Sequence, residues 1–124
     1  MPEPLRSLLR QESVTVIRHR AAGAQVAPSA TTLTALYAVP QKYQARGRVF
    51  VANRSGVATS YRISVQLGGV ADDVKQYLAY DTAIAGNANA VTEEFALDQA
   101  DEVNVYATLA TLSFSWLGVE EPLP

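Results

Sequence analysis

The clearest signal in the chain is a strict alternation of apolar and polar residues over residues 59–67, TSYRISVQL. One face of an extended strand would carry the four apolar side chains, Tyr61, Ile63, Val65 and Leu67. Successive side chains of a strand point to opposite sides, so this pattern is typical of an antiparallel strand with one buried and one solvated face. We therefore predict a half-buried strand that ends in a turn at Gly68-Gly69.

Similar runs follow one another from residue 30 to the C-terminus, each closed by turn-forming residues. They cover residues 31–39, 47–54, 75–84, 90–97, 102–110 and 111–120. The last run places Leu112, Phe114 and Trp116 on one face. About seven or eight short strands separated by regular turn signals are typical of a two-layered antiparallel fold. The sequence therefore predicts an all-β fold, a single antiparallel β-sandwich or jelly-roll-like domain that forms a body at residues 30–124.

Residues 1–29 have a different pattern and are predicted to form an N-terminal arm. Two prolines precede Leu5, Leu8 and Leu9, whose spacing suits a short helix, and an extended conformation fits the same residues. Residues 13–19, SVTVIRH, then alternate as a strand does. Residues 21–30, AAGAQVAPSA, are predicted to be a flexible linker of small residues between the arm and the body.

The composition fits a folded domain that has few residues suited to catalysis or metal binding. The 124 residues include no cysteine and one histidine, and 18% of them are charged. Without cysteine the chain forms no disulfide, no thiolate nucleophile and no cysteine-type zinc site. The N-terminus lacks the pattern of a signal peptide, and no run approaches the roughly 18 apolar residues of a membrane span. We expect a soluble protein that is kept in the cell of synthesis until assembly or lysis and has no membrane partner.

Charge is unevenly distributed along the chain, although the net charge is only −2. Residues 1–62 hold nine Lys and Arg residues against two acids, and residues 63–124 hold ten acids against Lys75. This contrast is typical of complementary surfaces through which one subunit docks on another. It is equally consistent with a fold that interleaves the two halves, so that the charges cancel locally.

No group of residues forms a recognisable catalytic motif. His19 lies between two arginines, a setting that fits a surface or interface histidine better than a hydrolase triad. Adjacent acids such as Glu93 and Glu94 point to opposite faces of a strand and cannot share one substrate. Asp72 and Asp73 lack a calcium-loop pattern and, after the two glycines, would repel phosphate. We expect no catalytic residue, no metal, no cofactor and no enzyme, and we interpret the link after residue 67 as a solvated turn.

The arginines and the aromatic residues suggest contacts with protein. The acidic overall balance and the lack of an aromatic-studded basic strand disfavour nucleic acid as the partner of the arginines. Acidic protein surface is the better match. Six aromatic residues are predicted to fill the core or a subunit interface, with most of them pointing inward: Tyr37, Tyr61, Tyr77, Tyr80, Tyr106 and Trp116.

Four segments in order resemble a known group of proteins. They are TTLTALYAVP at 31–40, VFVANRSGVATSYRISV at 49–65, ADDVKQYLAYDTAIAGNANAV at 71–91 and DEVNVYATLATLSFSWLGVE at 101–120. Together they resemble small virion structural proteins of tailed bacteriophages, which are decoration (cement) or tail-accessory proteins. The resemblance covers roughly residues 30–120, and the arm departs from the shorter starts of the group. It implies a non-enzymatic component of the virion, made in the host cytoplasm before assembly.

Within that group we expect a capsid decoration protein that binds the major capsid protein and stabilises the head. We expect a dimer or trimer whose arm and basic face grip the capsid. The expected contact residues are Leu5, Leu8, Leu9, Ile17, Arg18, Arg20, Arg46 and Arg48. One alternative is a neck, tail or baseplate accessory protein that binds other virion proteins. A second alternative, supported by the tyrosines and Trp116, is a carbohydrate-binding module.

Overall fold

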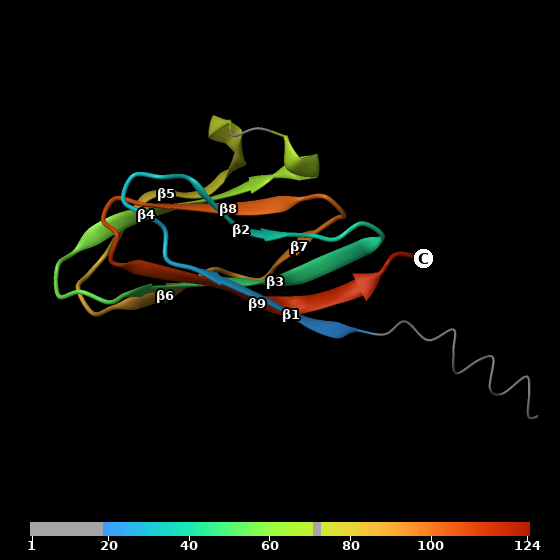
Figure 1. Ribbon diagram of the computed structural model, residues 1–124, viewed down its shortest axis with the longest axis horizontal. Helices are drawn as coiled ribbons and strands as arrows, with labels where there is room; N and C mark the ends of the chain where they lie inside the picture. The colour runs from blue at the N-terminus through green and yellow to red at the C-terminus, as the bar shows by residue number, and fades with distance from the viewer. Residues whose placement is uncertain (1–18, 71–72) are drawn as a thin grey trace, which may run out of the picture.

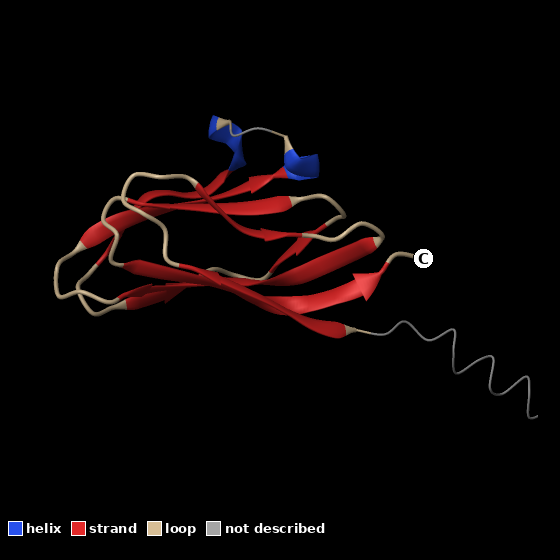
Figure 2. Cartoon of the chain, viewed as in Figure 1, coloured by secondary structure: helices blue, strands red, loops and turns tan. Residues whose placement is uncertain are grey.

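The computed structural model describes residues 19–70 and 73–124, which form two antiparallel sheets packed face to face (Figure 1). The first sheet contains, in spatial order, β1 (Arg20–Val26), β9 (Leu112–Pro122), β3 (Tyr43–Asn53) and then β6 (Asn89–Val91) and β7 (Phe95–Leu97), both beside β3. The second sheet contains β2 (Thr34–Ala38), β8 (Glu102–Ala107), β4 (Thr59–Gln66) and β5 (Tyr77–Ile84). Figure 2 shows strands in both layers, loops at the two ends, and two short helical turns beside the second sheet.

The predicted antiparallel β-sandwich is confirmed. Every strand pair is antiparallel. The strand order is that of a jelly roll in which β6 and β7 together occupy the position of one strand. The run predicted at 90–97 is interrupted because the side chain of Thr92 replaces a ladder partner: its Oγ1 accepts a hydrogen bond from Val49 N at 3.0 Å. Glu93 and Glu94 lie in this break and are both exposed.

The core lies between the two sheets and matches the alternation in the sequence. Leu112, Phe114 and Trp116 of β9 are fully buried, as predicted for the closing run. Across from them, Ile63 of β4 and the inward residues of β8 complete the core. Burial of such side chains stabilises each by about 1.5–3 kcal/mol, and this burial is the main force that holds the sheets together.

The structure corrects the predicted linker. Residues 20–26 form β1, which pairs with β9 along its whole length, from Arg20 opposite Glu120 to Val26 opposite Phe114. The linker prediction is therefore wrong for residues 21–26: their small side chains carry little strand preference, but the edge of β9 supplies the pairing. The predicted helix in the arm and the strand predicted at 13–19, apart from His19, lie outside the described residues.

The structure also corrects the place of Leu67. The alternation of β4 holds through Tyr61 and Ile63, which are buried, but Leu67 leaves the sheet and begins the short 3₁₀ turn η1 (Leu67–Gly69). Gly68 and Gly69 have φ angles of +64° and +76°, which glycine adopts without strain. The predicted turn is thus confirmed, whereas Leu67 is 65% exposed. A second turn, η2 (Val74–Gln76), leads back to β5.

Candidate functional site

The two long sides of the sandwich differ. On one side the edge strands β1 and β2 are in contact, so the layers close on each other. On the other side, β5 ends the second sheet and β7 lies at the far edge of the first. Between these strands an apolar groove opens, with a volume of about 610 Å³. This size falls within the range of ligand and peptide sites.

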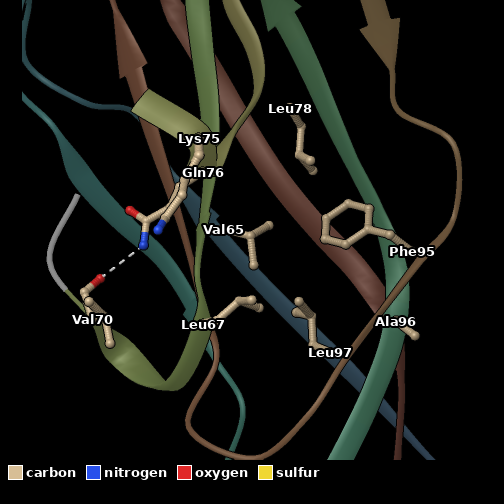
Figure 3. Close-up of a pocket in the computed structure, with 9 residues that line it drawn as sticks. All are labelled: Val65, Leu67, Val70, Lys75, Gln76, Leu78, Phe95, Ala96 and Leu97. Atoms are coloured by element: carbon tan, nitrogen blue, oxygen red, sulfur yellow. Dashed lines mark hydrogen bonds between the residues drawn. The ribbon is translucent and has the colours of Figure 1, made fainter. Parts of the chain in front are cut away.

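The walls of the groove come from both sheets and from the segment between β4 and β5. One wall is formed by Val65, Leu67, Val70, Gln76 and Leu78, and the other by Phe95, Ala96 and Leu97 of β7. Figure 3 shows these side chains around a common space, with Val65 and Leu67 across from Phe95 and Leu97.

Several apolar side chains of this wall are more exposed than a folded protein requires. Leu67, Val70 and Leu78 are each more than half exposed, and Leu78 has an exposed fraction of 55%. Contiguous apolar surface of this kind is typical of a site for another protein or ligand. The sequence interpretation of this link as merely a solvated turn missed its apolar residues. Their signal was the recurrence of apolar residues at 67, 70, 74 and 78.

Polar contacts hold the groove wall in place. The buried carboxylate of Asp101 accepts a hydrogen bond from Gly68 N at 2.8 Å and another from Asp98 N at 2.8 Å. At the start of η2, Asp73 N donates to the Gln76 side-chain oxygen at 2.7 Å. The Gln76 amide donates to the carbonyl of Val70 at 3.4 Å, as Figure 3 shows. The turns that carry the exposed apolar residues are therefore anchored to the sandwich.

The segments that form the groove carry acidic residues at their ends. Glu93 and Glu94 precede β7, Asp98 follows it, and Asp73 precedes η2; all four are exposed. Among the residues that line the groove, Lys75 is the one cation. The surroundings of the groove therefore suit a partner that is apolar and basic.

A second exposed cluster lies on the outer face of the second sheet. The guanidinium of Arg62 lies between two rings, 4.1 Å from the centroid of Tyr80 and 4.4 Å from that of Tyr106. Arg62 Nε also donates to the Asp81 carboxylate at 2.7 Å, and this hydrogen bond lowers the pKa of Asp81. Tyr77 packs edge-on against Tyr80.

The prediction that most aromatic residues point inward is only partly right. Tyr61 and Trp116 are buried in the core. Tyr80 is 56% exposed, and Tyr106 faces outward because its strand neighbours Val105 and Ala107 are the inward residues of β8.

The predicted arginine anchors that are described are engaged within the chain. Arg20 Nε donates to Glu120 Oε1 at 2.7 Å and its guanidinium lies 4.0 Å from the centre of the Tyr43 ring. Arg46 lies 3.2 Å from Glu121, which His19 also contacts at 3.0 Å. Arg48 is exposed beside Arg46 on the outer face of β3, and its Nη1 donates to the carbonyl of Thr92 at 3.4 Å. The other predicted contacts lie outside the described residues: Leu5, Leu8, Leu9, Ile17 and Arg18.

These ion pairs also bear on the uneven charge of the chain. Arg20 with Glu120, Arg46 with Glu121 and Arg62 with Asp81 each join a base of the first half to an acid of the second. The fold interleaves the halves at these places, and the charges there cancel locally.

Glu120 organises the closed side of the sandwich. Its buried carboxylate accepts hydrogen bonds from Arg20 and from the Tyr37 hydroxyl. Burial, and then the hydrogen bond to Glu120, raise the pKa of Tyr37. These contacts tie β1, β2 and β9 together.

Within residues 19–70 and 73–124 no three His, Asp or Glu side chains come together as a metal site. Over the same residues no helix has the length and apolar character needed to span a membrane.

Comparisons with known proteins identify a shared fold. No protein-family model matches the chain, and no curated protein matches it. Among solved structures it is similar to a chain of Bacillus endospore appendages, which form a novel family of disulfide-linked pili, with a TM-score of 0.55 and 19% identity over 88% of this chain and 90% of that one. It is also similar to a chain in the acidic stable capsid structure of Helicobacter pylori bacteriophage KHP30, with a TM-score of 0.49 and 15% identity over 88% of this chain and 94% of that one. The similarity to the appendage chain shows that the two share a fold.

Proposed function

We propose that this protein is a non-enzymatic structural protein of a tailed-phage virion, namely a capsid decoration protein that binds the major capsid protein and stabilises the head. The observation that carries the proposal is the outer face of the first sheet, which exposes arginines beside large apolar side chains on an otherwise well-packed sandwich. The resemblance of the four ordered segments to phage virion proteins supports the same assignment.

The outer face of the first sheet is the surface that we assign to the capsid protein. Arg46 and Arg48 of β3 lie there beside the exposed side chains of Phe50 and Leu117. Arginine and aromatic residues on a surface of mixed polarity are typical of protein interfaces. Arg20 is held by Glu120, so we assign it to holding β1 in place and not to contact with the partner.

The predicted arm supplies a second contact, to a neighbouring subunit of the particle. Leu5, Leu8, Leu9 and Ile17 provide its apolar contacts and Arg18 its charge. Repetition over a lattice multiplies weak contacts into firm attachment, so no single surface has to be large.

Immunogold electron microscopy of intact particles, with antibody to the recombinant protein, tests the location. We expect gold distributed evenly over the heads. Gold confined to the neck or tail would instead identify a connector or baseplate ring, and particles without any gold would exclude a virion role.

Binding to purified heads that lack the protein tests the proposed face. Arg48→Glu reverses a charge on that face and should weaken binding to the heads. Arg54→Glu, outside β3, makes the same change in charge and should bind as the unmodified protein does. Equal binding by both variants would show that the outer face of the first sheet is not the contact.

Carbohydrate binding is the second candidate, favoured by the exposed cluster of Arg62, Tyr80 and Tyr106. Aromatic rings beside charged hydrogen-bonding groups are suited to sugars as well as to protein. A glycan array separates the two functions: binding that is lost in Tyr80→Ala would favour this candidate, and an array without signal would exclude it for the glycans displayed.

A further inference from the structure

We propose that the apolar groove binds the N-terminal segment of a second copy of this protein, with Leu5, Leu8 and Leu9 entering the groove, so that subunits join head to tail. This inference goes beyond the location of the protein in a virion. It concerns how copies of the chain join one another.

The groove is built to accept a further segment of chain. β5 pairs with β4 on one side only, and β7 pairs with β3. Both therefore present an edge that no described strand covers, on either side of an apolar space. Open edges are natural places for another chain to add, and an apolar groove accepts an amphipathic segment through its spaced apolar residues.

The N-terminal segment matches the groove in chemistry. Residues 1–18 hold three leucines within five residues, followed by Val14, Val16 and Ile17. They also hold Arg6, Arg10 and Arg18 against two acids. The groove has the complementary properties, because its walls are apolar and the segments around it carry exposed acids at 73, 93, 94 and 98.

The position of β1 points to a second copy as the donor. The described chain starts beside Arg20, which Glu120 and Tyr43 hold at the closed side of the sandwich. The groove lies at the other side, beyond β9 and β3 in the sheet. A donor site and an acceptor site on opposite sides of one body produce a head-to-tail contact. Eighteen extended residues reach roughly 60 Å, which is enough to enter a neighbouring groove.

Disulfide trapping tests the proposal cleanly because the chain contains no cysteine. Leu8→Cys and Leu78→Cys are prepared as separate full-length proteins that carry tags of different size, then mixed and mildly oxidised. We expect a mixed disulfide between the two proteins. It should form about tenfold more than with Val57→Cys in place of Leu78→Cys, because docking raises the effective concentration of the thiols.

Val57 is the matched control because its exposed fraction of 60% is close to the 55% of Leu78. It follows β3, whereas β7 pairs with the first residues of that strand, so Val57 lies at the opposite end of the sandwich from the groove. Equal yields of mixed disulfide with the two acceptors, or none with either, would overturn the proposal.

A double variant tests whether the N-terminal segment enters the groove of a second copy or the groove of its own chain. Leu8→Cys with Leu78→Cys in one chain should give a ladder of linked oligomers on a non-reducing gel. An internally linked monomer would overturn the proposal by showing that each segment fills its own groove. Both measurements use purified protein, so their failure would leave the proposed virion location intact, and unlabelled particles would leave the head-to-tail contact intact.

Leu78→Asp provides an independent readout. It places a charge in the groove and should reduce the oligomers detected by light scattering, while the thermal transition of the protein stays in place. Val57→Asp should retain the oligomers. An unchanged oligomer distribution in Leu78→Asp would contradict occupation of the groove.

Discussion

The closed and the open side of the sandwich complete their edge strands in different ways. On the closed side, Tyr37 of β2 stacks on Trp116 of β9 with ring centroids 4.9 Å apart, and Glu120 joins Tyr37 to Arg20. On the open side, β5 and β7 flank a groove whose apolar walls remain exposed. The closed side uses its edge residues to stabilise the fold. The open side keeps apolar surface available for a partner.

Trp116 lies where the two sides meet. Tyr37 stacks on its ring from the closed side, and Phe95 packs against it at 5.3 Å, edge to face, from the groove. The ring is fully buried, and its Nε1 has no hydrogen-bond partner in the described structure. A segment that enters the groove would therefore meet Phe95, whose ring packs directly on Trp116 in the core.

The largest effect is expected at this shared residue. Trp116→Ala removes the contacts to both sides and leaves a cavity, which should lower the free energy of unfolding by about 3–5 kcal/mol. Urea denaturation measures the loss. Phe95→Ala removes only the open-side partner, which is partly exposed, and should cost clearly less. Equal losses would show that the open side belongs to the core as fully as the closed side does.

Glu120→Gln removes a hydrogen bond on the closed side only. The neutral amide has one acceptor oxygen in place of two, so either Arg20 or the partly buried Tyr37 hydroxyl loses its acceptor at this buried carboxylate, and the free energy of unfolding should fall by about 1–3 kcal/mol. Glu121→Gln is the matched control on the same strand: its side chain is more exposed, 18% against 8% for Glu120, and the change should cost about 0–1 kcal/mol. The shift in urea midpoint at pH 7 compares the two variants. A larger loss of stability in Glu121→Gln would contradict the assignment of Glu120 as the residue that holds the closed side together.

The pH dependence of stability should report on Tyr37. Its pKa is raised in the folded protein, so its contribution is fully present below the unfolded value of about 10 and is lost as the pH rises above it. From about pH 10 to 12 the melting temperature should fall, and it should fall less steeply in Tyr37→Phe, which has no proton to lose. Tyr61, whose pKa burial also raises, remains in both proteins as an internal reference. Identical slopes would contradict the role of Tyr37.

The smallest effect on stability is expected on the open side. Leu78→Ser changes an exposed residue of the groove wall, so the free energy of unfolding should stay within about 0.5 kcal/mol. Thermal melts of dilute protein check this. A loss similar to that of Glu120→Gln would mean that the open side stabilises the fold of the single chain.

Strands were predicted correctly where apolar and polar side chains alternate, and were missed where only pairing with a neighbouring strand makes the segment extended. The run around Phe114 and the part of β4 up to Ile63 were predicted correctly because a buried face requires an apolar residue at every second position. Beyond Ile63 the prediction fails: the register with β5 shifts there, and Ser64 and Gln66, predicted to be solvated, are buried. β1 was missed because its Ala- and Gly-rich residues carry no such pattern; a strand forms there because β9 offers an edge. Leu67 was placed in the core because its alternation continues beyond the point where the glycines turn the chain away.

The candidate site divides in the same way. The sequence by itself determined the layered β fold, the turn at Gly68-Gly69 and the exposed arginines of β3, because each depends on neighbours in the chain. Only the tertiary structure decided that Val65 and Leu97 face one groove, that Arg20 is held by Glu120, and that Tyr80 is exposed. The physical reason is that burial and contact depend on what lies opposite, and the packing of two sheets brings together residues that are distant in sequence.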